Sequence, residues 1–298
     1  VVYIGSKDGM AGEITVGNIT EFIMYVFMLT WPVTALGWTS SQIQRAAASQ
    51  KRINEFLQAK SELEIGKQIV KPISGNWVFK NVSFTYPGSD REILNQLTFE
   101  IESGESVALL GTTGSGKSSL AQLLARFYDP SSGDILLDGV SLKDWDIKHV
   151  RQSLAYVPQD VFLFSTTIAE NISFGQDGMS NEQIMHAAKM ADVYENIMEF
   201  PDQFETILGE RGVTLSGGQK QRVSIARALA KNPTMLILDD CLSAVDTHTE
   251  HKILNNLKKI MVGKTSLIIS HRVSSAKLAK RIMVLQDGQI VETGNHLQ

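Results

Sequence analysis

The stretch GTTGSGKS, Gly111 to Ser118, decides the fold of this chain. It fits the pattern GxxxxGK[ST], and it lies between two segments with different hydrophobic patterns. The apolar run SVALLG before it predicts a buried strand, and KSSLAQLLARFY after it predicts an amphipathic helix. A glycine-rich turn from a strand into a helix can close around a phosphate group. The sequence therefore predicts an α/β fold with a phosphate-binding loop, the P-loop, at residues 111–118.

This loop predicts a site for ATP and Mg²⁺. Backbone N–H groups and the positive end of the following helix favour the α- and β-phosphates. Lys117 is expected to reach the β- and γ-phosphates, and Ser118 to ligate Mg²⁺. The expected ATP contacts are Gly111, Thr112, Thr113, Gly114, Ser115, Gly116, Lys117, Ser118 and Ser119.

The run MLILDD at residues 235–240 predicts a second part of the site. Its apolar residues indicate a buried parallel strand, and Asp239 stands at the carboxyl end. Ligands of open α/β sheets bind at that end of the strands. We therefore expect Asp239 to hold Mg²⁺ through water.

The motif LSGGQ, Leu215 to Gln219, narrows the interpretation to one family. Together with the two motifs above, it makes the chain from 75 to 298 resemble the nucleotide-binding domain of an ABC transporter. The resemblance implies a P-loop NTPase core with a helical subdomain and an antiparallel β subdomain. It also implies that two such domains face each other head to tail, so that the LSGGQ of one, comprising Leu215, Ser216, Gly217, Gly218 and Gln219, closes over the ATP of the other. One chain holds one set of motifs, so a second chain is expected.

Four single residues occupy positions that match landmarks of this family. Tyr86 resembles the aromatic residue that stacks on adenine, and Gln159 the glutamine that touches Mg²⁺. Asp246 resembles the aspartate that couples the two domains, and His271 the histidine that contacts the γ-phosphate. Each alone has a plainer interpretation, a strand cap or a solvated loop residue. Their occurrence in this order along one domain favours the functional roles.

The segment before this domain predicts a membrane helix. No charged residue occurs between 22 and 44, which is close to the roughly 20 residues that span a bilayer. Basic residues follow this run and acidic residues mostly precede it, so its carboxyl end is expected to face the cytoplasm. A buried helix of a soluble domain is the competing interpretation. The expected division is a membrane part at 1–58, with the helix at about 19–44 and a cytoplasmic extension to 57, and a linker at 59–74.

The two ends of the chain suggest a piece of a longer polypeptide. Residues 1–5 are expected to end a preceding membrane helix, and residues 6–18 to form a short external loop. The final TGNHLQ resembles the start of a closing segment of the family, so a last helix is expected beyond it.

Composition bounds the function classes. The formal net charge of −4 gives no reason to expect a nucleic-acid partner. Soluble ABC-type ATPases of DNA repair and translation remain a third alternative, and the membrane segment argues against them. The one cysteine, Cys241, excludes an internal disulfide and fits a reducing cytosol.

The segments 125–139 and 205–212 resemble those of ABC exporters. In those proteins the second segment, with Glu210 and Arg211 here, couples hydrolysis to the membrane domains. We therefore expect a half-transporter in a bacterial plasma membrane that exports a lipid, drug or peptide-like solute.

Asp240 departs from the family pattern, which has the glutamate that activates the attacking water at this position. Aspartate is one methylene shorter, and a misplacement of about 1 Å can cost roughly 10²-fold in rate. One hypothesis is that the chain's own site hydrolyses ATP slowly, while its LSGGQ motif completes a competent site on a partner in a heterodimer. The alternatives are a homodimer with Asp240 as the base, and a regulatory subunit that binds ATP without turnover.

Overall fold

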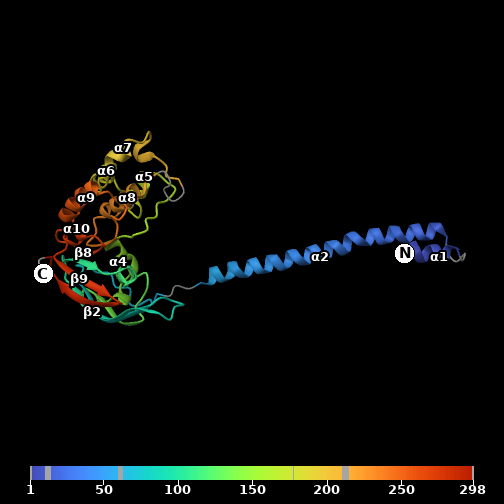
Figure 1. Ribbon diagram of the computed structural model, residues 1–298, viewed down its shortest axis with the longest axis horizontal. Helices are drawn as coiled ribbons and strands as arrows, with labels where there is room; N and C mark the ends of the chain where they lie inside the picture. Colours follow the sequence, from blue (N-terminus) through green and yellow to red (C-terminus); the bar gives the residue numbers. More distant parts are fainter. Residues whose placement is uncertain (1, 11–14, 60–62, 177, 210–214, 297–298) are drawn as a thin grey trace. The chain divides into compact units, whose positions relative to one another are not determined.

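The computed structural model describes residues 2–10, 15–59, 63–176, 178–209 and 215–296, and the chain divides into two compact units, Val1–Ser61 and Glu62–Gln298 (Figure 1). The first unit holds helices α1 (Val2–Met10) and α2 (Val16–Gln58). Thr15 caps α2, because its hydroxyl accepts the N–H of Asn18 while the Asn18 side chain accepts the N–H of Thr15. This capping box starts α2 before the expected Ile19.

The expected external loop at residues 6–18 is wrong at both ends. Helix α1 continues to Met10 and α2 has already begun at Val16. The sequence SKDGM contains no proline that would stop α1.

Helix α2 is a single helix of 43 residues, and none of its side chains is buried within the chain. In the described part of the chain it is the one helix that is long and apolar enough to cross a membrane. Large apolar side chains such as Phe27 and Trp31 stand 74% and 77% exposed. A helix that is apolar and uncovered needs lipid or other helices around it.

A six-stranded sheet with the order β10-β9-β3-β8-β7-β6 forms the core of the second unit. Its pairs are parallel, except that β10 runs antiparallel to β9. The strands are β3 (Ser106–Leu110), β6 (Leu154–Val157), β7 (Met235–Asp239), β8 (Thr265–Ile269), β9 (Arg281–Gln286) and β10 (Gln289–Gly294). Because β3, β7 and β8 are parallel, their carboxyl ends lie at one edge, where the P-loop and Asp239 follow.

A four-stranded antiparallel sheet with the order β2-β1-β4-β5 packs against this core. Its strands are β1 (Trp77–Thr85), β2 (Glu92–Ile101), β4 (Ser132–Leu137) and β5 (Val140–Ser141). Successive side chains of β3 point to opposite faces of the sheet and so pack into two different hydrophobic cores. Val107 and Leu109 belong to the core shared with the antiparallel sheet, and Ala108 belongs to the core formed with the helices.

Helix α3 (Lys117–Leu124) lies in the cluster shared by the two sheets, through Leu120 and Leu124. Figure 1 shows α5 to α9 gathered at one end of the unit, away from β2. The remaining helices are α4 (Ile147–Ser153), α5 (Ile168–Ser173), α6 (Asn181–Met190), α7 (Tyr194–Met198), α8 (Gly217–Ala230), α9 (Thr247–Ile260) and α10 (Val273–Ala276). The expected α/β core with a helical and an antiparallel β subdomain is confirmed.

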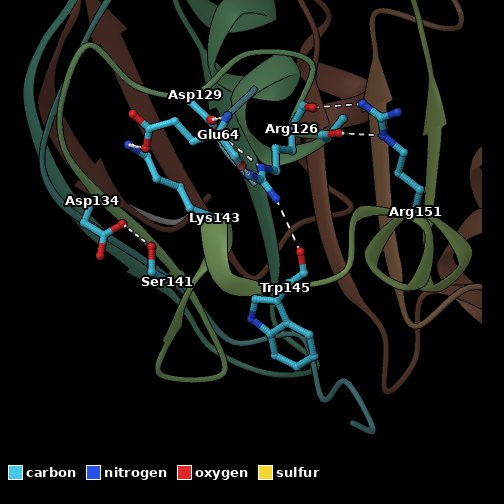
Figure 2. Close-up of polar contacts among 9 residues, drawn as sticks. Glu64, Arg126, Asp129, Asp134, Ser141, Lys143, Trp145 and Arg151 are labelled. Carbon is cyan, nitrogen blue, oxygen red and sulfur yellow. Dashed lines mark hydrogen bonds and ion pairs between the residues drawn. The ribbon is translucent and has the colours of Figure 1, made fainter. Parts of the chain in front are cut away.

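Within the second unit, Arg126 and Lys143 hold Glu64, near the start of that unit, by hydrogen bonds (Figure 2). The buried Arg126 donates to the carbonyls of Glu64 and Trp145 and forms an ion pair with Asp129 at 3.1 Å. Lys143 Nζ lies 2.7 Å from Oε2 of Glu64. Arg126 lies two residues after the end of α3, so this end of the predicted linker contacts the chain close to the P-loop helix.

Candidate nucleotide site

The P-loop has a backbone that side chains would obstruct. A Cβ on Gly111 would stand 2.1 Å from the carbonyl oxygen of Leu285, and one on Gly116 would stand 2.6 Å from Cδ2 of Leu94. Gly114 has a positive φ of 83° and open space around it. Neighbouring atoms thus leave no room for a side chain at Gly111 and Gly116, and the backbone conformation favours glycine at Gly114. The loop leaves room for an anion against its backbone.

Lys117 begins α3, and its side chain turns back toward the loop. Its ammonium donates to the carbonyls of Gly111 at 2.9 Å and Thr112 at 2.7 Å. Burial lowers the pKa of Lys117, and the charges of Asp239 and Asp240 act in the opposite direction. A buried cation beside the backbone of this loop favours a polyphosphate.

Asp239 is the buried last residue of β7 and faces the P-loop helix. Its carboxylate accepts hydrogen bonds from the hydroxyls of Ser118 and Tyr156, the latter at 3.3 Å. Burial raises the pKa of Asp239, and the charge of Asp240 adds to this effect. Burial also raises the pKa of Tyr156, with Asp239 contributing, so the phenol stays a donor. Such a carboxylate gains from a cation beside it.

Asp240 lies at the turn that leaves β7. Its φ is 44°, in the left-handed region that aspartate tolerates better than most residues, and its N–H donates to Ile269 O at 2.8 Å. This turn places Asp240 beside Asp239 in the same pocket.

One pocket of about 450 Å³ collects the predicted residues from separate segments. Eleven of them line it: Tyr86, Thr113, Gly114, Gly116, Lys117, Ser118, Ser119, Gln159, Asp239, Asp240 and His271. Three P-loop residues do not line it, namely Gly111, Thr112 and Ser115. The first two supply the carbonyls that hold Lys117, and Ser115 is buried with no hydrogen-bond partner for its Oγ among the described residues.

Tyr86 is half-buried and lines this pocket. Its hydroxyl lies 2.8 Å from the hydroxyl of Ser119 and donates to Gln122 Oε1 at 2.8 Å. Its ring meets those of Phe84 and Tyr128 edge to face. The ring is therefore held by the hydrogen bonds of its hydroxyl and by two neighbouring aromatic rings.

The LSGGQ motif lies apart from this pocket in the described chain. Leu215 is buried, while Ser216 and Gly217 are exposed at the start of α8. The Ser216 hydroxyl accepts the N–H of Gln219, and the Gln219 side chain accepts the N–H of Ser216. Asp246 caps α9, because its carboxylate accepts the N–H groups of His248 and Thr249. The residues that begin both helices, Ser216 and Asp246, are exposed and do not line the nucleotide pocket. An anion bound at residues 216–218 would therefore not be the one held in this chain's own pocket.

The family is decided by a match to a model described as "ABC transporter", which covers residues 94–243, half of the chain. The chain belongs to the ABC transporter family. It therefore carries the nucleotide-binding domain of an ABC transporter.

Several known ABC transporters are similar over almost the whole chain. It is 43% identical over 290 residues to an ATP-dependent lipid A-core flippase of Aromatoleum aromaticum, covering 97% of this chain and 48% of the relative. It is 41% identical over 292 residues to the multidrug resistance-like ATP-binding protein MdlA of Escherichia coli, covering 98% and 50%. The structure of a bacterial Atm1-family ABC exporter with ATP bound matches with a TM-score of 0.79 and 38% identity, covering 96% of this chain and 50% of that one. The chain thus spans about half the length of these ABC proteins.

Sequence reasoning missed some residues of this ABC transporter domain. Arg91, Ile93 and Ile269 also line the pocket. No local motif marks them, because the fold brings β2 and the end of β8 against the P-loop. The segment with Glu210 and Arg211 lies outside the described residues.

The donors in the pocket of this ABC domain fit Mg²⁺ held together with phosphate. Within the described residues, no three His, Cys, Asp or Glu side chains are grouped to hold a metal by themselves. Oxygen donors are present in Ser118, Gln159 and Asp239, which line one pocket. Mg²⁺ prefers this kind of site, with a carboxylate, phosphate oxygens and water.

Proposed function

We propose that this chain binds and hydrolyses ATP as part of an exporter-type ABC half-transporter. The pocket that joins Tyr86, the P-loop, Gln159, Asp239 and His271 carries this proposal. Its residues supply a flat aromatic face, an anion cradle and oxygen donors in one cavity, which matches the parts of MgATP.

The binding roles follow from these positions. Tyr86 stacks on adenine, the loop amides and Lys117 hold the phosphates, and Ser118, Gln159 and Asp239 hold Mg²⁺. When bound, Mg²⁺ neutralises charge on the β- and γ-phosphate oxygens. Hydrogen bonds from Ser118 and Tyr156 hold the Asp239 carboxylate in place.

The chemical roles fall to Asp240 and His271. Asp240 orients the attacking water and takes its proton, and His271 donates a hydrogen bond to the γ-phosphate, where charge develops. The short Asp240 side chain makes this site slow. We propose that the chain works in a heterodimer, where its Leu215–Gln219 motif completes a faster site on the partner.

The whole protein is proposed to lie in a bacterial plasma membrane. The exposed apolar surface of α2 supports its assignment as the last membrane helix, followed by a nucleotide-binding domain in the cytoplasm. The similar flippase and multidrug proteins support export of a lipid, drug or peptide-like solute.

The test is ATP turnover of the full-length protein alone in lipid nanodiscs, beside its Asp240→Glu variant. A nearly inert wild type with an active variant supports the slow site and the heterodimer. Equal turnover of both contradicts the slow site and indicates a homodimer with an aspartate base. Absence of turnover in both, with ATP retained after long incubation, contradicts hydrolysis and indicates a regulatory subunit.

A further inference from the structure

Arg272 follows His271 in the loop after β8, and its side chain is hydrogen-bonded to the segment that follows β7. Its guanidinium donates to Ser243 O at 3.1 Å and to Val245 O at 3.4 Å. Both acceptors belong to the loop between Asp240 and Asp246. The side chain of Arg272, which is next to His271 in sequence, is therefore hydrogen-bonded to the loop between Asp240 and Asp246.

Glu250 orients Arg272 from helix α9. Its side chain is 5% exposed and pairs with Nη1 of Arg272, while its other oxygen accepts the hydroxyl of Ser274. A buried carboxylate needs such partners, because an unpaired charge in that position is strongly destabilising. The segment 272–274 and helix α9 are thus held together.

The same loop is fastened to α8 on its other side. The buried Gln221 donates to Ser243 Oγ and accepts the N–H of Ala244, both at 2.9 Å. A Cβ on Gly218 would stand 2.9 Å from Ala244 O, so the two backbones touch. The loop 240–246 is therefore held between the helix that carries LSGGQ and the loop that carries His271.

We propose that Arg272 is a positioning residue for hydrolysis, with Glu250 holding it in place; this rests on the proposed ATPase function. It fixes His271 relative to Asp246 and the start of α8, so that the chain's own site and the surface it offers to a partner's ATP move together. Neither Arg272 nor Glu250 lines the nucleotide pocket. Their removal therefore lowers turnover and leaves nucleotide binding in place.

The experiment uses the full-length protein in nanodiscs with the double variant Arg272→Met/Glu250→Gln, which leaves no unpaired charge buried. The matched control is Arg281→Met/Glu105→Gln, an ion pair of 2.7 Å between β9 and the start of β3. Where the wild type is slow, all variants are compared in the Asp240→Glu background. We expect kcat to fall about 10- to 100-fold in the double variant, with KM and the Kd of a fluorescent ATP analogue within about twofold. Arg272→Lys should keep part of kcat, because lysine can still pair with Glu250. The recovery should be incomplete, because lysine lacks the guanidinium that donates to the carbonyls of Ser243 and Val245 at the same time.

Hydrogen exchange of residues 241–247 gives a second measurement that does not need turnover. It should rise in the double variant and stay unchanged in the control. Unchanged exchange with wild-type kcat overturns the proposal, as does an equal loss of kcat and nucleotide affinity. Absence of turnover in every background contradicts the proposed ATPase function, while the exchange result still decides whether Arg272 holds the loop.

Discussion

The ammonium of Lys117 donates a 2.7 Å hydrogen bond to the carbonyl of Thr112, inside the loop that precedes its own helix. A second bond goes to Gly111 O. An ammonium has three donors, and among the described residues these two bonds leave the third for a phosphate oxygen.

Lys117→Ala should weaken ATP binding by about 1.5–3 kcal/mol, or roughly 10- to 100-fold in Kd, because a charged hydrogen bond to phosphate is lost. Calorimetry or a fluorescent nucleotide measures this loss. The control is Lys67→Ala, which removes a lysine whose side chain is 75% exposed and should leave Kd unchanged. Equal ATP affinity of Lys117→Ala and wild type would contradict the site assignment.

Tyr86→Ala should weaken ATP by about 1–3 kcal/mol, as expected for lost base stacking, and leave pyrophosphate binding unchanged. Tyr86→Phe keeps the ring and loses only the bonds to Ser119 and Gln122, so its effect should be smaller. Binding titrations with both ligands decide. Equal losses for ATP and pyrophosphate would indicate misfolding in place of lost stacking.

Asp239 and Asp246 should change stability with pH in opposite directions. The pKa of Asp239 is raised, mainly by burial, so this group stabilises the fold at low pH and the contribution is lost as pH rises through its folded pKa. Asp239→Asn should therefore raise Tm at pH 7 to 8 without nucleotide or Mg²⁺, and weaken Mg²⁺-dependent ATP binding.

The pKa of Asp246 is lowered, chiefly by the N–H of Thr249, so its contribution is present at neutral pH and lost as pH falls. Asp246→Ala should lower Tm at pH 7, and this loss should shrink as pH falls through the lowered pKa of Asp246. Thermal scans from pH 3 to 8 check both signs, and a shared sign for the two variants would refute the electrostatic argument.

Cys241 should resist alkylation in the folded protein. It is buried, and burial raises the pKa of its thiol to about 12. The thiolate fraction at pH 8 is then on the order of 10⁻⁴. Mass spectrometry after iodoacetamide treatment should find Cys241 modified only in denaturant, whereas Ser89→Cys, at an exposed position, should react at once. Rapid labelling of native Cys241 would show that the segment after β7 opens readily.

Local pattern was enough for the elements that carry their own signals. The helix predicted at 19–57 is found at Val16–Gln58, because a long helical pattern with a charge-free stretch at 22–44 can be recognised without knowledge of its tertiary partners. The pattern KSSLAQLLARFY predicts a helix to Tyr128, but α3 ends at Leu124. The reason is that Arg126 has a positive φ and its guanidinium donates to the carbonyl of Glu64, a partner from another part of the chain.

The sequence by itself determined the P-loop, the strand that ends at Asp239 and the family. The P-loop and the strand are each marked by residues within a few positions of one another, and the family is marked by several such local motifs in a fixed order along the chain. Only the tertiary structure decided that Arg91 joins the nucleotide pocket and that Arg272 meets Glu250, because these partners come from different elements. A single arginine or glutamate carries no local pattern. Its role is fixed by the packing that buries it and by the partner that its charge then requires.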